Sequence, residues 1–214
     1  MRPSLTRTKR LLTYANERPI ERCCLGLSML LLSSCGGKVL YPKYYAMEIP
    51  PPPPQPSNIR VLGTLAVRRF ESAPYIRQKK IVYRPVPEEI GFYEYHRWVN
   101  DPAETVTTAV IESLRSSGLF SLVKRYDGQN EQDYLMAGRL DRLEETDYGG
   151  HVSVTAKLSA ELLNLRTGTT EWTGDAAETL KVDERNINSI VIELGNAVQK
   201  SIDQLITSVT RQLQ

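Results

Sequence analysis

Apolar and polar residues alternate over one long stretch in the second half of the chain. From His151 to Leu162 every even position is apolar and every odd position is polar. Successive side chains of a strand point to opposite faces, so this pattern predicts a strand with one buried and one solvated face. Strands of similar length are expected at 134–145 and 169–182, each joined to it by a short turn that contains glycine. The three segments predict an antiparallel meander.

Shorter apolar runs precede the meander and predict additional strands at 59–70, 80–84 and 92–95. The last two are separated by Pro85-Val86-Pro87. Proline cannot donate a hydrogen bond within a sheet, so this tripeptide predicts a turn. The strand-rich part of the domain is therefore expected to begin well before the meander.

Two segments repeat apolar residues at steps of three and four, which is the period of a helix. The first carries end signals, with Asp101 as N-cap, Pro102 at the first helical position and Gly118 as the stop. The second runs from Ile187 to Leu213, and its polar face lacks the lysines and arginines of a membrane-surface helix. The predicted fold class is α+β, an antiparallel β-sheet covered by two helices, including a long C-terminal amphipathic helix.

The N-terminal part has the pattern of an export signal. A basic stretch is followed by about ten apolar residues ending at Leu32, whereas a spanning helix needs roughly 20. Leu32-Ser33-Ser34-Cys35 resembles the lipobox of bacterial lipoproteins, in which the cysteine is lipidated and becomes the mature N-terminus. We therefore expect a lipoprotein signal peptide at 1–34 and palmitate-type acyl chains on Cys35. Gly36 replaces the aspartate that commonly retains lipoproteins in the inner membrane, which favours the outer membrane.

The mature chain divides into a tether and a domain. Residues 35–57 include five consecutive prolines, which adopt the extended polyproline II helix. We interpret this segment as a lipid-anchored, Pro-rich tether rather than as a ligand for a proline-recognising module. Residues 58–214 are expected to form a periplasmic α+β domain that folds without metal or cofactor, as a monomer or a small homo-oligomer.

Charge and cysteine content exclude some classes of function. The formal net charge is +2, but residues 1–34 carry +4 and residues 35–214 carry −2. The body has no basic run, so we expect no binding to nucleic acid. All three cysteines lie within the first 35 residues. The domain therefore has neither a disulfide framework nor a thiolate nucleophile.

The sequence offers no recognisable catalytic set. Its two histidines, His96 and His151, are far apart, and no G-x-S-x-G nucleophile elbow is present. Glu144, Glu145 and Asp147 form an acidic cluster that we interpret as a solvated loop, with a weak cation site as the alternative. We expect no enzymatic activity, no cofactor and no metal centre.

Short motifs in a fixed order connect the chain to a known family. Tyr44-Tyr45-Ala46-Met47 is similar to that family's Tyr-Tyr-x-Leu segment near the mature start, with Met47 in place of leucine. Tyr95-His96-Arg97-Trp98 looks like its Arg-Trp segment before the first helix, and the residues from Ser116 to Val123 look like its helix exit into the next strand. Behind a lipobox, this order resembles the auxiliary lipoprotein component of ABC-type transport systems, the family of paraquat-inducible protein C.

The resemblance implies a non-catalytic subunit that acts with a mammalian-cell-entry (MCE) domain protein and with the permease and ATPase of an ABC transport system. The cargo would be lipids or other hydrophobic compounds that move between the two membranes. Partner contacts are expected at Tyr44, Tyr45, Arg97 and Trp98, with core packing as the alternative for Arg97 and Trp98. The alternative function is a structural lipoprotein that docks on, or assembles, another outer-membrane complex.

Overall fold

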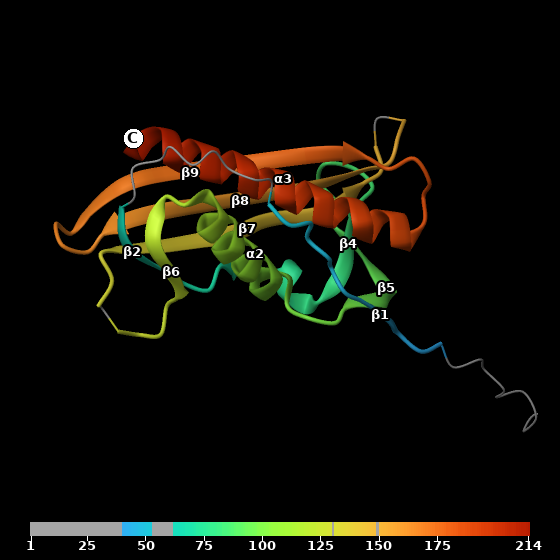
Figure 1. Ribbon diagram of the computed structural model, residues 1–214. Helices are drawn as coiled ribbons and strands as arrows, with labels where there is room; N and C mark the ends of the chain where they lie inside the picture. Colours follow the sequence, from blue (N-terminus) through green and yellow to red (C-terminus); the bar gives the residue numbers. More distant parts are fainter. Residues whose placement is uncertain (1–39, 53–61, 130, 149) are drawn as a thin grey trace, which may run out of the picture. The chain divides into compact units, whose positions relative to one another are not determined.

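The computed structural model describes residues 40–52, 62–129, 131–148 and 150–214, and Tyr41–Gln214 forms one compact unit. In this unit a nine-stranded sheet carries helices on one face (Figure 1). The strands are β1 (Lys43–Tyr45), β2 (Leu62–Val67), β3 (Glu71–Ser72), β4 (Lys80–Arg84), β5 (Gly91–Trp98), β6 (Phe120–Arg125), β7 (Tyr134–Thr146), β8 (Ser153–Asn164) and β9 (Thr169–Lys181). The helices are α2 (Pro102–Ser117) and α3 (Ile187–Leu213), with a short 3₁₀ turn, η2, at Ile76–Gln78.

The long strand β7 organises the sheet. Along one edge it pairs with β8 in the antiparallel sense, and β8 pairs in the same sense with β9. Along the other edge it pairs in succession with the short strands β2, β3 and β4, all parallel to it. Two further parallel pairs extend the sheet. Strand β6 pairs with β2, and strand β1 pairs with β5.

The sheet is therefore mixed. The prediction of an antiparallel sheet is wrong for the pairings of its N-terminal strands, except that β4 and β5 are antiparallel. Alternation along a sequence reports which face a strand buries, but it carries no information about the direction of the neighbouring strand. The antiparallel meander itself is confirmed, since β7 and β9 lie within one residue of their predicted bounds and β8 lies two residues further along the chain than predicted. The α+β class and the long C-terminal helix are confirmed as well.

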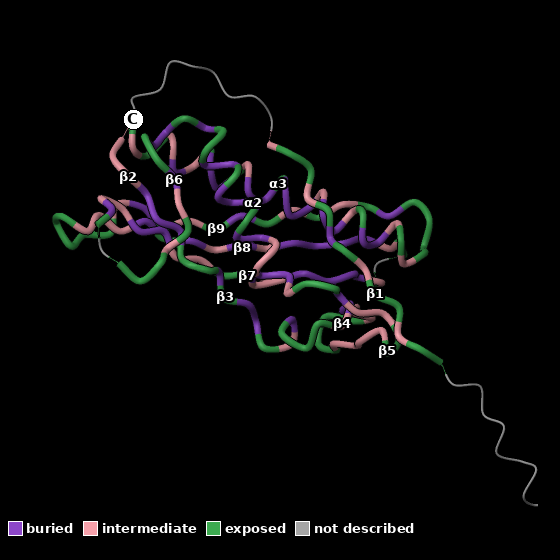
Figure 2. The backbone as a smooth tube through the Cα atoms, turned by 60° about the horizontal axis from the view of Figure 1, so that its bottom comes forward, coloured by how far each residue is buried: buried purple, intermediate pink, exposed green. Residues whose placement is uncertain are grey.

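The core lies where the helices meet the meander. In β8 the even residues from Val154 to Leu162 are all buried, as the alternation predicts. They face α3, whose Leu194 and Ile202 have no exposed surface. Figure 2 shows the buried positions concentrated along the strands and along the facing side of the helices. At about 1.5–3 kcal/mol for each large apolar side chain, this interface is a major contribution to folding.

Both helices begin at side-chain caps. The Asp101 carboxylate accepts a hydrogen bond from the Ala103 N–H at 2.9 Å, and Asn186 Oδ1 accepts one from the Ser189 N–H at 2.9 Å. These contacts satisfy N–H groups that have no partner within the helix. Helix α2 ends at Gly118, whose φ of 67° lies in the left-handed region that glycine adopts most readily. The predicted start and stop of this helix are confirmed.

The segment that follows β1 crosses the helical face of the domain. Met47 is buried in the core, and a Cβ on Gly195 of α3 would overlap the carbonyl oxygen of Glu48. Glycine at position 195 therefore lets the segment lie directly on the helix backbone. Figure 1 shows this segment, coloured blue, running from β1 toward α3. Residues 41–52, which the sequence analysis assigned to the tether, thus belong to the folded unit.

Candidate functional site

The four residues expected to contact a partner come together where β1 pairs with β5. In that register Tyr44 lies opposite Arg97 and Tyr45 lies opposite Trp98. The Tyr44 side chain is 59% exposed, whereas Trp98 is only 3% exposed and packs in the core. Trp98 therefore packs beneath this edge of the sheet, in agreement with the core-packing alternative. Tyr44 and part of Arg97 form the surface of the edge.

A tyrosine–histidine contact joins β1 to β5 on the inner side of the same edge. The Tyr45 hydroxyl and His96 Nδ1 are 2.9 Å apart, and the two ring centroids are separated by 5.5 Å. Burial of the imidazole, together with the nearby charge of Lys43, lowers the pKa of His96. Both effects favour the neutral imidazole, and the His96 ring serves as a packing and hydrogen-bonding group for β1.

The acidic cluster is not a solvated loop. Glu144 and Glu145 are the last carboxylates of β7, and neither side chain has exposed surface. They point to opposite faces of the sheet, because neighbouring strand residues alternate. The interpretation from sequence is wrong for these two residues because β7 continues to Thr146, and only Asp147 lies beyond the strand.

Glu144 is held by arginines on the face away from the helices. Arg84 Nε lies 2.8 Å from Glu144 Oε1, and Arg142 forms a second ion pair with the same oxygen. The Tyr75 hydroxyl donates to Oε2 at 3.3 Å. Burial alone would raise the pKa of Glu144, but the hydrogen bonds and charges of the two arginines outweigh it and hold this pKa below its usual value. Burial and the same carboxylate raise the pKa of Tyr75 to about 12.

Glu145 is held more weakly on the opposite face. It accepts a hydrogen bond from the Tyr93 hydroxyl at 2.6 Å and lies 3.3 Å from Arg185 Nε. Arg185 is shared with Asp147, to which it comes within 2.6 Å. Burial raises the pKa of Glu145 above its usual value despite these contacts. Adjacent residues of one strand thus have pKa values displaced in opposite directions.

Substitution of the two glutamates by glutamine should have opposite consequences at pH 7. A lowered folded-state pKa means that ionised Glu144 stabilises the fold above its unfolded pKa, and this contribution disappears as the pH falls through the folded value. Glu144→Gln should therefore lower the free energy of unfolding at pH 7 by about 1–3 kcal/mol, with a smaller deficit below pH ~4.

Glu145 follows the reverse rule, since its folded-state pKa is raised. Its contribution is present below the unfolded pKa and is lost as the pH rises through the folded value. Glu145→Gln should leave the free energy of unfolding at pH 7 unchanged or raise it. Urea unfolding of both variants at pH 7 and pH 4 tests this difference, and an equal loss in the two variants at pH 7 would contradict it.

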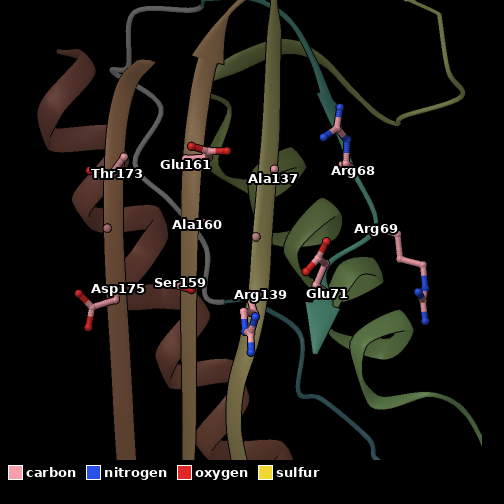
Figure 3. Close-up of a pocket in the computed structure, with 12 residues that line it drawn as sticks. Arg68, Arg69, Glu71, Ala137, Arg139, Ser159, Ala160, Glu161, Thr173 and Asp175 are labelled. Carbon is pink, nitrogen blue, oxygen red and sulfur yellow. The ribbon is translucent and has the colours of Figure 1, made fainter. Parts of the chain in front are cut away.

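The most prominent depression of the described surface lies on the face of the sheet opposite the helices. Figure 3 shows it across β7, β8 and β9, with the helices behind the strands. Three of its six charged residues form ion pairs: Arg139 lies 3.1 Å from Asp141, Asp175 lies 3.3 Å from Lys157, and Arg69 lies 2.6 Å from Asp101. Charges of both signs neutralise one another here, so the depression has no distinct ligand chemistry.

Two other residues considered in the sequence are Cys35 and His151. Cys35 lies outside the described residues, so its lipidation stays a prediction. His151 is exposed ahead of β8 rather than within the strand. Over the described residues, no group of three or more His, Cys, Asp or Glu side chains could hold a metal ion, and no helix is long and apolar enough to cross a membrane.

The described residues form an α+β domain in which a mixed sheet is covered by a long C-terminal helix. The chain belongs to the family of ABC-type transport auxiliary lipoprotein components, whose family model matches residues 45–206. The resemblance found in the sequence is thereby confirmed, from β1 to most of α3.

Two solved structures with TM-scores above 0.5 share the fold. A Xanthomonas campestris protein of family DUF330 is 20% identical, with a TM-score of 0.70 over 79% of this chain and 95% of its own. A second, uncharacterised protein is 12% identical, with a TM-score of 0.60 over 79% of this chain and 99% of its own. The PelC dodecamer from Paraburkholderia phytofirmans is more distant, with 14% identity and a TM-score of 0.46 over 74% of this chain and 93% of its own. No curated protein sequence matches the chain.

Proposed function

We propose that this protein is the lipid-anchored periplasmic subunit of an ABC transport system that moves lipids or other hydrophobic compounds. It would act by binding an MCE-domain protein, which works with the permease and the ATPase, rather than by catalysis. The observation that carries the proposal is the family match, which covers the folded unit from Tyr45 to residue 206. The lipobox at Cys35 and the glycine at position 36 support anchoring in the outer membrane.

The arrangement of the fold is compatible with a tethered binding subunit. The chain enters the domain at β1, whereas the C-terminal end of α3 lies at the other end of the sheet (Figure 1). With the anchor on the β1 side, the far end of the sheet is free to meet a partner that reaches across the periplasm.

The proposal is tested by cross-linking the tagged lipoprotein in intact cells and identifying the proteins that co-purify. An MCE-domain protein is expected among them, and deletion of the gene should reproduce the detergent sensitivity caused by loss of the transporter. A secretin or a cell-wall enzyme in place of the MCE protein would instead favour the assembly of another outer-membrane complex. Genes for an MCE protein and a permease beside this gene would agree with the transport role.

A further inference from the structure

Three tyrosines gather at the edge of the sheet where the chain enters the domain. Tyr41 is 79% exposed, Tyr44 is 59% exposed and Tyr95 is 43% exposed. In the parallel β1–β5 register Lys43 lies opposite His96. Tyr95 is therefore level with residue 42, which follows Tyr41 in the chain. We call these three tyrosines the anchor-side patch. The sequence shows that this region is rich in aromatic residues. It does not show that these three tyrosines are exposed, because exposure depends on the fold.

Charged side chains of both signs, three of them basic, flank the anchor-side patch: Lys43, Lys80, Arg97 and Glu94. The parallel register sets Arg97 opposite Tyr44, and Lys80 lies opposite Arg97 on the other side of β5. Lys80 is paired with Glu94 at 2.7 Å. The Arg97 Nε atom, in contrast, is buried with no hydrogen-bond partner among the described residues. The edge therefore combines amphipathic rings with the partly exposed side chain of Arg97 and the exposed side chain of Lys43.

The covalent chain keeps this edge close to the anchor. Six peptide bonds separate Cys35 from Tyr41, which limits the distance between their Cα atoms to about 20 Å. A domain held this closely samples the membrane surface at high effective concentration, so a weak contact is enough to orient it. The Pro-rich segment adds no length here, because it follows β1 in the chain.

We propose that the anchor-side patch lies on the phospholipid headgroups of the membrane that holds the anchor. Tyrosine rings favour the boundary between water and lipid, because one end of the ring is apolar and the other is hydrated. Arg97 and Lys43 supply the positive charge that attracts anionic phosphate groups. The inference rests on the proposed lipidation of Cys35 and gives that lipoprotein a fixed orientation on its membrane.

The patch is tested by photo-cross-linking of the full-length lipoprotein, purified from membranes and reconstituted into vesicles of phosphatidylethanolamine and phosphatidylglycerol. The photoreactive residue p-benzoylphenylalanine replaces Tyr44 or Tyr95 in separate proteins. A matched control carries it in place of Leu122, which is 53% exposed on β6, at the other end of the strand order. We expect several-fold more cross-linking to phospholipid from the patch positions than from the control.

Four results would overturn the inference. Equal phospholipid cross-linking from all three positions would mean that the patch is not directed to the membrane. Cross-links from positions 44 and 95 to a protein in intact cells would assign the edge to a protein partner instead. Labelling with a palmitate analogue separates the two proposals. Labelled protein without lipid cross-links overturns this inference alone, whereas unlabelled protein overturns the anchor and the inference together.

Discussion

Leu194→Asp should destabilise the domain by about 3–5 kcal/mol, because it places an uncompensated charge in an apolar interface. Leu194 has no exposed surface and lies at the centre of the face that α3 packs against the meander. Neither backbone nor solvent can solvate a carboxylate there without separating the helix from the sheet. The loss is measured by urea unfolding of the compact unit Tyr41–Gln214, as a lower midpoint at a similar slope.

The same helix provides a matched control. Ile192 lies two residues earlier and is 60% exposed, so Ile192→Asp adds the same charge to the solvated face. Its free energy of unfolding should stay within about 0.5 kcal/mol of the unmodified protein. Tolerance of Leu194→Asp, or an equal loss in the two variants, would mean that α3 does not cover the sheet in solution.

Cys35→Ala should abolish labelling by a palmitate analogue and leave the protein uncleaved or mislocalised. The thiol of Cys35 is the proposed site of acyl attachment, and two or three acyl chains hold a protein on a bilayer effectively permanently, where one chain gives only reversible binding. Radiolabelled or clickable palmitate, followed by membrane fractionation, measures the effect.

Cys24→Ala is the control for this experiment, because Cys24 lies within the apolar run that precedes the lipobox. It should keep full labelling and normal localisation. Unchanged labelling of Cys35→Ala would show that the anchor lies elsewhere. Full complementation by a soluble periplasmic form of the protein would show that tethering is dispensable for its function.

The sequence predicted the elements whose signal is local. The alternation in β8 and the three–four spacing in α3 each arise from a single buried face, so they can be read without knowledge of the partner. The end signals Asp101 and Gly118 act within one helical turn, and both lie where they were expected. Packing against the rest of the chain changed none of these assignments.

What the sequence did not predict depends on distant residues. Parallel pairing of β2 with β7 joins Leu65 to Tyr134, and no local pattern encodes such a contact. Glu144 is buried against Arg84, which comes from another strand. The sequence does not show this contact, and the acidic neighbours of Glu144 suggested a solvated loop. Partner contacts at Tyr44 and Arg97 stay predictions, although the structure brings the two residues together.

The arrangement of strands around β7 also sets an order of events for any chain that emerges N-terminus first, as in synthesis or in the export proposed above. The meander joins neighbours in sequence and can form rapidly, whereas β2, β3 and β4 find their partner only after β7 has emerged. The N-terminal strands therefore keep open edges toward β7 until the C-terminal half is delivered. Such intermediates expose apolar surface and are prone to aggregation, so chaperones should matter most during this interval.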